Sequence, residues 1–186
     1  MDDKPAARDV GPCVTLGIDQ EVFAVPVEAV QEILAMRPVF RIPDAPRYLR
    51  GLIDVRGRGV PVIDLRVKLG LPAAPETENS RILVLEVPLA ARPLVLGLVA
   101  DRVFEVAGLD DGRVEPPPDV GARWRSDYIR GIGRRNNTFV VVLDLAKLFS
   151  SADARLLDAR AGSAAAATAA DAQGEPALVD EELFVT

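Results

Sequence analysis

Residues 51–66 read G-L-I-D-V-R-G-R-G-V-P-V-I-D-L-R, and this stretch decides the fold. Two short apolar runs flank a turn of sequence R-G-R-G at 56–59. Glycine adopts the positive φ angles of tight turns without steric cost, so the stretch predicts a β-hairpin. Asp64 fits the cap of a short helix that follows the hairpin, and Gly70 fits the end of that helix.

The same pattern occurs again later in the chain. Residues 48–52 (YLRGL) match 128–132 (YIRGI), and residues 60–65 (VPVIDL) match 140–145 (VVVLDL), both at an offset of 80. A looser match, at an offset of 73, pairs Val30, Glu32 and Ile33 with Val103, Glu105 and Val106. A shared offset in two separate motifs indicates an internal duplication, in which each unit closes with the same hairpin and helix.

We therefore predict a mainly β fold of two five-stranded antiparallel β-barrel subdomains with short helices. The first barrel would span about 13–70 and the second about 81–150, with a linker at 71–80. One small antiparallel sheet is marginally stable alone, and curling it into a barrel removes its exposed edges. Apolar residues at helix-like spacing predict a helix over 27–34. Pro61 cannot donate a hydrogen bond to a neighbouring strand, which predicts an edge or a bulge there.

Both ends of the chain are predicted to lie outside the folded unit of 13–150. Residues 1–12 form a polar lead-in that we expect to be disordered, and 151–162 has the composition of a possible helix. Residues 163–186 form an acidic, Ala-rich tail that we also expect to be disordered. Its apolar stretch at 183–185 is the part most able to dock, yet removal of the tail should leave the melting midpoint nearly unchanged.

The charge distribution argues against a nucleic-acid-binding protein. The net charge is −6, but residues 13–150 hold 18 acidic and 18 basic residues, so the acidity resides in the tails. Proteins that bind phosphate backbones normally carry a basic excess or stripe. Aromatic residues, which stack on single-stranded bases, make up only 5% of the chain. A small-barrel nucleic-acid-binding protein remains the alternative, and salt-dependent binding to single-stranded DNA would separate the two.

Composition also argues against an enzyme. The chain has no His and a single Cys, Cys13, so the nucleophile–His arrangements of hydrolases cannot form. Asp64 and Asp144 are better interpreted as helix caps than as paired catalytic carboxylates. We therefore expect no catalytic residues, no cofactor and no metal site. No window of 18 apolar residues lacks charge or proline, which predicts no direct membrane insertion and a cytoplasmic location.

The run at 51–66 resembles the signature hairpin of the CheW family, the coupling proteins of bacterial chemotaxis. The segments V-Q-E-I at 30–33, R-I-P at 41–43 and Y-I-R-G at 128–131 resemble other segments of that family, in the same order. This resemblance covers about 13–150. It implies two intertwined five-stranded barrels and a non-enzymatic adaptor. Such an adaptor joins methyl-accepting chemotaxis receptors to the regulatory domain of the histidine kinase CheA, and is recruited to receptor arrays at the membrane.

The resemblance also assigns two sets of site residues. Those tied to receptor binding are Arg56, Glu32, Val30, Ile33, Gly51 and Gly57. Those tied to kinase binding are Glu115 and Val120. An arginine and a carboxylate can join through two parallel hydrogen bonds, so we expect Arg56 and Glu32 to form a pair. The length of 186 residues favours a free-standing adaptor over the kinase's own domain or a fusion to a receiver domain. One departure is Asp54, where the family often has Asn.

Overall fold

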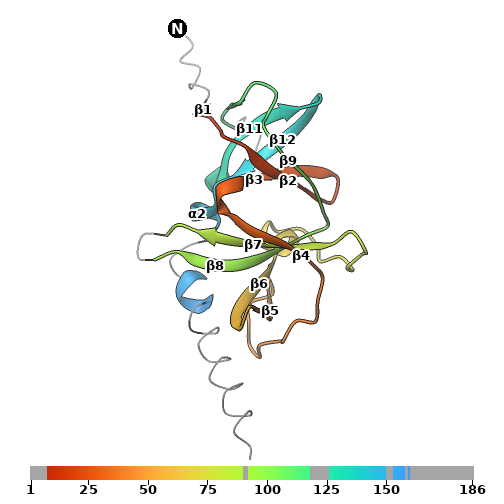
Figure 1. Cartoon of the computed structure of the whole chain (residues 1–186), viewed down its shortest axis with the longest axis vertical. Helices are drawn as coiled ribbons and strands as arrows, with labels where there is room; N and C mark the ends of the chain where they lie inside the picture. Colours follow the sequence, from red (N-terminus) through yellow and green to blue (C-terminus); the bar gives the residue numbers. More distant parts are fainter. Residues whose placement is uncertain (1–7, 90–91, 118–125, 150–152, 158, 160–186) are drawn as a thin grey trace, which may run out of the picture.

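A computed structural model describes residues 8–89, 92–117, 126–149, 153–157 and 159. Two five-stranded sheets form separate layers, and a two-stranded sheet lies beside one of them (Figure 1). The elements in chain order are β1 (Arg8–Asp9), β2 (Cys13–Ile18), β3 (Glu21–Pro26), η1 (Val27–Ala29), β4 (Val30–Ala35), β5 (Leu49–Val55), β6 (Arg58–Asp64), α1 (Leu65–Lys68), β7 (Arg81–Val87), β8 (Leu94–Ala100), β9 (Arg102–Ala107), β10 (Arg113–Val114), η2 (Ser126–Tyr128), β11 (Ile129–Arg135), β12 (Thr138–Leu143) and α2 (Leu145–Leu148).

The two large sheets have equivalent strand orders. Sheet I runs β11-β12-β3-β2-β9, and sheet II runs β5-β6-β8-β7-β4. Neighbouring strands are antiparallel except for the pairs β12–β3 and β6–β8, which are parallel. The mainly β, two-subdomain fold is thus confirmed, but the sheets are mixed rather than antiparallel. Among the described residues the outer strands of a sheet do not pair with each other, so closed barrels are not observed.

The predicted duplication is visible in the repeated hairpin and helix. Hairpin β5–β6 with helix α1 corresponds to hairpin β11–β12 with helix α2. The Asp64 carboxylate accepts a hydrogen bond from the Val67 N–H at 3.2 Å, and the Asp144 carboxylate accepts one from the Lys147 N–H at 3.1 Å. Both aspartates therefore act as helix caps, as the sequence predicted.

Each large sheet takes strands from both repeats. The first repeat supplies β2–β6, and the second supplies β7–β9, β11 and β12. Sheet I joins β2 and β3 to the last three strands of the second repeat, whereas sheet II joins β7 and β8 to the last three strands of the first. The ranges 13–70 and 81–150 are therefore the repeats and not the sheets. The chain crosses between sheets at η1, which separates β3 from β4 (Figure 1).

Three apolar layers follow from this arrangement. A central layer lies between the sheets, and one further layer covers the outer face of each sheet. Alternation along β2 shows the principle, because Val14 and Leu16 face the central layer while Cys13 faces the outer layer of sheet I. Cys13 is fully buried, and burial raises the pKa of its thiol. Cys13 thus serves as a small buried side chain of an apolar strand.

The predicted helix over 27–34 is wrong. Only η1 is helical, and β4 follows it as an edge strand of sheet II. A register shift between Val30 and Glu32 marks a β-bulge, so that Val30 pairs with Leu85 and Ile33 pairs with Leu83. Directly paired residues share a sheet face, which places Val30 and Ile33 on one face although they are three residues apart. The bulge therefore imitates the spacing of a helix.

Of the two alternatives for Pro61, the edge is wrong, whereas a bulge does lie close by, between Leu49 and Gly51, which pair with Ile63 and Val62. Strand β6 lies inside sheet II, between β8 and β5, and is not an edge. Its pairing with β8 begins only at Val62, one residue beyond Pro61. The missing N–H of Pro61 therefore removes no hydrogen bond between these two strands.

Part of the predicted lead-in is ordered. Within 1–12, strand β1 pairs with β10 antiparallel, and Val10 is buried in the outer layer of sheet I. Residues 153–157, inside the possible helix of 151–162, are helical. Residues 1–7 and the tail at 163–186 lie outside the described residues. Among the helices that the structure describes, none is long and apolar enough to cross a membrane.

Candidate functional site

The turn of hairpin β5–β6 exposes the arginine that the sequence singled out. Arg56 and Gly57 form a two-residue turn with φ angles of 55° and 78°, between the paired residues Val55 and Arg58. Two successive positive φ angles are the geometry of a type I′ turn, which matches the twist of the flanking strands. The Gly57 N–H donates to the Asp54 carboxylate at 3.2 Å. The Arg56 side chain is 82% exposed as a result of its position in this turn.

Glu32 on β4 is the partner of Arg56. The Arg56 Nη2 and Glu32 Oε1 atoms are 3.6 Å apart, so the structure brings the two predicted site residues together. This distance is longer than a hydrogen bond, and the expected fork of two hydrogen bonds is not formed. An exposed ion pair of this kind contributes little to stability. It links the edge strand β4 to the tip of the hairpin.

Ile33 and Val30 differ in what they can offer to a partner. The Ile33 side chain is 41% exposed, which is unusual for a large apolar residue. Val30 is partly buried and packs against the central layer. Because both lie on one face of β4, Ile33 extends the central apolar layer to the molecular surface.

Gly51 and Gly57 have separate structural reasons for being glycine. At Gly51 the φ angle is 141°, and an added Cβ would lie 2.0 Å from the main-chain oxygen of Phe40. Phe40 pairs through its main chain with Leu52, in two hydrogen bonds of 2.8 Å each. Gly51 thus allows the preceding segment to approach the hairpin. Gly57 has open space around it and is required only by its positive φ angle.

A second glutamate–arginine pair occupies the matching place in the other repeat. The Glu105 carboxylate on β9, the edge strand of sheet I, accepts hydrogen bonds from the Arg135 Nε at 3.0 Å and Nη2 at 2.8 Å. Arg135 also donates to the main-chain oxygen of Gly108 at 2.8 Å. Val106, next to this pair, is 57% exposed. The sequence analysis missed the pair, although the match at an offset of 73 already aligned Glu105 with Glu32.

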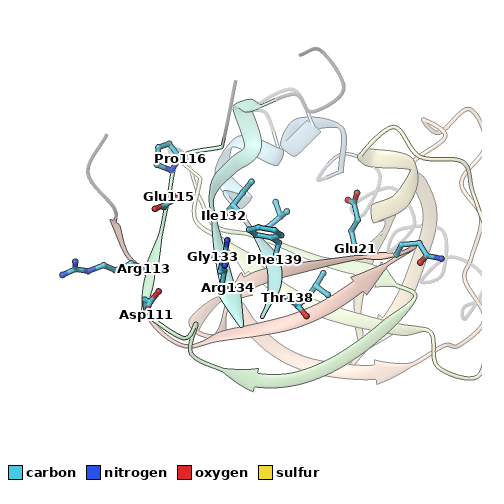
Figure 2. A pocket seen from close by; sticks show the side chains of 13 residues that line it. Glu21, Asp111, Arg113, Glu115, Pro116, Ile132, Gly133, Arg134, Thr138 and Phe139 are labelled. Carbon is cyan, nitrogen blue, oxygen red and sulfur yellow. The ribbon is translucent and has the colours of Figure 1, made fainter. Parts of the chain in front are cut away.

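The predicted kinase-binding residue Glu115 lines an open groove of about 1230 Å³ on sheet I (Figure 2). Ile132 and Phe139 lie in the middle of this groove, and Phe139 is 62% exposed. Glu115 lies on one side of them and Glu21 on the other (Figure 2). Burial, followed by the charge of the nearby Asp19, raises the pKa of the Glu21 carboxyl. The groove thus joins an apolar floor to acidic walls.

Arginines complete the rim of this groove. The Arg134 guanidinium stacks over the Phe139 ring at 4.7 Å from its centre, and Arg113 also lines the groove. Aromatic and arginine side chains are the residue types enriched where proteins bind each other. Val120, the other predicted kinase-binding residue, lies outside the described residues.

The described part of the chain contains no group of three or more His, Cys, Asp or Glu side chains that could hold a metal ion. The arrangement offers exposed apolar side chains, ion pairs and an open groove. These are means of binding another protein.

Comparisons with known proteins show the family to which this chain belongs. The CheW-like domain family matches residues 12–153. "Chemotaxis protein CheW" of Treponema pallidum is 31% identical over 77% of this chain and 85% of its own length. The protein of that name from Klebsiella aerogenes is 32% identical over 77% of this chain and 83% of its own length. The crystal structure of the scaffolding protein TtCheW from Thermoanaerobacter tengcongensis is similar with a TM-score of 0.66 and 27% identity, and the match covers 76% of this chain and 94% of that one.

Proposed function

Because this chain belongs to the CheW family, we propose that it is a chemotaxis adaptor that couples methyl-accepting receptors to the histidine kinase CheA. Its relatives carry the name chemotaxis protein, and its structural neighbour is titled a scaffolding protein. On this proposal the chain is a non-catalytic scaffold that works in the cytoplasm and is recruited to receptor arrays at the membrane.

The observation that carries the receptor half of the proposal is the Arg56–Glu32 pair. It lies at the exposed tip of the hairpin, beside the exposed apolar side chain of Ile33. A receptor tip built of helices would present an apolar stripe with polar flanks, and Ile33 with the ion pair complements such a surface. We assign Arg56, Glu32 and Ile33 to direct contact. Val30, Gly51 and Gly57 support the geometry of that surface.

Kinase activation in reconstituted receptor–kinase complexes tests this half. Arg56→Ala and Glu32→Ala should each lower activation about tenfold or more, the size of a binding hot spot. Arg58→Ala is the matched control, because Arg58 is exposed, directly follows the turn as the first residue of β6, and has no ion pair with any described residue. The exchanged variant Arg56→Glu with Glu32→Arg should recover part of the activity if the pair acts as a unit. Full activation by a folded Arg56→Ala variant would remove the arginine from the site.

The kinase half of the proposal uses the groove of sheet I. Glu115 belongs to a proline-rich stretch, and rigid segments lose little conformational entropy on binding. Glu115→Lys, or Val120→Asp, should weaken binding of the CheA regulatory domain more than receptor binding. Glu78→Lys, an exposed change of the same charge on the linker, is the control. Equal losses of both activities, or of neither, would contradict this assignment.

A further inference from the structure

A second groove, of about 710 Å³, lies on sheet II next to hairpin β5–β6. Its walls come from the segment between β4 and β5, from the start of β5 and from the linker that follows α1. Apolar side chains in it include Met36, Val39 and Ile42. Its charged residues are Arg37, Arg41, Arg47, Arg50, Asp64 and Glu76.

The acidic side chains of this groove do not neutralise all of its arginines, so positive charge is in excess. Arg50 pairs with Glu76 of the linker, and Asp64 is occupied as the cap of α1. Arg37 donates only to a main-chain oxygen, that of Asp54, at 3.2 Å. Arg41 and Arg47 are exposed, and neither forms an ion pair within the part of the chain that the structure describes. The groove is thus an open, mainly polar surface that contains a few apolar side chains and is rimmed by arginines in excess of acidic residues.

The internal repeat indicates that the hairpin does not require Arg47. Tyr48 and Tyr128 occupy equivalent positions, and the residue before the second tyrosine is Asp127, where the first repeat has Arg47. The equivalent hairpin nevertheless forms in both repeats. Arg47 is therefore available for binding, and the excess of arginines at the groove favours a negatively charged occupant.

We propose that this groove binds the acidic end of the chain itself, residues 180–185 (D-E-E-L-F-V), which lie outside the described part. The three carboxylates complement the arginine rim, and the three apolar residues that follow them are suited to contact Met36, Val39 and Ile42. The tail segment carries its carboxylates beside apolar residues, and the groove carries its arginines beside apolar side chains, so charge and apolar groups are complementary.

The path of the chain brings the tail close to the groove. The carboxylate of Asp153 accepts a hydrogen bond from the Tyr48 hydroxyl at 2.5 Å and pairs with Lys68 at 3.1 Å. Tyr48 and Lys68 directly neighbour the groove residues Arg47 and Val67 in the sequence. The helical residues at 153–157 are thus held by residues that directly follow groove residues in the sequence.

The length between this anchor and the acidic segment is suitable. About 20 residues separate residue 159 from residue 180, a length that reaches at most roughly 70 Å when fully extended. Covalent attachment raises the effective concentration of the acidic segment at the groove over that of a free peptide. The contact is independent of the proposed receptor and kinase binding. It would, however, lie beside the hairpin, because Arg37 of the groove contacts the main chain of Asp54.

Paramagnetic broadening in the full chain tests the proposal. A nitroxide is attached at Thr186→Cys, and the buried Cys13 stays unmodified in the folded protein. At low salt the label should broaden the amide signals of Met36, Val39 and Ala73, which line the groove. The double variant Arg41→Glu/Arg47→Glu should lose this broadening. Adding Asp180→Arg/Glu181→Arg to that variant should restore it, because the charges are then exchanged.

Two controls make the result specific. Arg130→Glu/Arg134→Glu makes the same change of charge on β11 of sheet I and should leave the broadening at the groove intact. In a mixture, the nitroxide and the isotope label are placed on different molecules, and broadening should then disappear. Broadening that persists in the mixture means that the tail binds another copy, which overturns the proposal. No broadening at the groove, or broadening that the charge exchange does not restore, overturns it as well.

Discussion

Gly51 and Gly57 lie on one hairpin, yet the surrounding structure constrains them differently. Gly51→Ala should destabilise the protein by roughly 3 kcal/mol or more, because it adds overpacking to a strained backbone. The new Cβ would lie 2.0 Å from the Phe40 oxygen at a φ angle of 141°. Gly57→Ala should cost only about 1–2 kcal/mol, the cost of a left-handed residue in open space. Urea unfolding of both variants measures the difference.

The comparison between the two variants is the control, since both add one methyl group to the same hairpin. A Gly51→Ala protein as stable as Gly57→Ala would contradict the close approach of the Phe40 segment. If a folded Gly57→Ala variant keeps full receptor coupling, the added methyl group does not disturb the receptor contact. Gly57 would then matter only because it allows the turn to form.

At the scale of single residues, the sequence identified the Arg56–Glu32 partners but not their geometry. The structure joins them at 3.6 Å without the expected fork, because a turn residue at a positive φ angle faces an edge strand instead of a helix. The second pair, Glu105–Arg135, escaped notice for a related reason. Arg135 does not align with Arg56 at the offset of 80, where Asn136 stands. The two arginines reach equivalent glutamates from different positions of the turn.

At the scale of elements, local signals predicted the hairpins and failed at the bulged edge strand β4. A two-residue turn and a helix cap are set by neighbouring residues, so β5–β6 and β11–β12 could be predicted. Strand β4 could not, because its bulge places residues three apart on one face. Strand β9 has the same feature, since Val103 pairs with Leu16 and Val106 pairs with Val14. A bulged strand and a helical turn thus leave the same apolar spacing in the sequence.

Tyr48 ties the helical residues at 153–157 to sheet II, and this contact should depend on pH. Burial, and then the hydrogen bond to Asp153 and the charge of Asp153, raise the pKa of the Tyr48 hydroxyl above its ordinary value. The contribution to stability is fully present below the unfolded-state pKa of about 10 and is lost as the pH rises above it. Tyr48→Phe should cost about 1 kcal/mol at neutral pH, the net value of one hydrogen bond. Its stability should approach that of the parent protein at alkaline pH.

Denaturant unfolding of the parent protein and of Tyr48→Phe, at several values between about pH 7 and 11, measures this difference. Cys13 has the same sign of dependence, because burial raises the pKa of its thiol as well. That contribution is common to both proteins and cancels in the difference. A constant gap between the two proteins over the whole range would show that the Tyr48 hydroxyl does not titrate with the contact.

At the scale of the whole molecule, the exchange of strands between repeats is the main feature that the repeats themselves do not predict. The sequence pattern of the two hairpins is compatible with two arrangements: one sheet for each repeat, or two sheets that each contain strands of both repeats. Only the strand pairs between repeats distinguish these arrangements, namely the parallel pairs β12–β3 and β6–β8 and the antiparallel pairs β2–β9 and β4–β7. The resemblance to the CheW family implied intertwining. Residue patterns alone supplied the number of strands and the duplication.

Cutting the linker between the repeats should leave a folded but dissociable protein. A protease site inserted after the exposed Ala74 allows the cut in the folded state, and the two fragments should remain together because each sheet contains strands of both. Unfolding of the cut protein should then depend on its concentration, whereas unfolding of the uncut insertion protein should not. After separation in denaturant, the fragment that carries β2–β6 should show no cooperative melting alone and should refold only with the other fragment. Size-exclusion chromatography and melting curves by circular dichroism provide the measurement. A separated fragment that melts cooperatively as a monomer would show that one repeat is sufficient for a sheet, and the intertwined topology would be wrong.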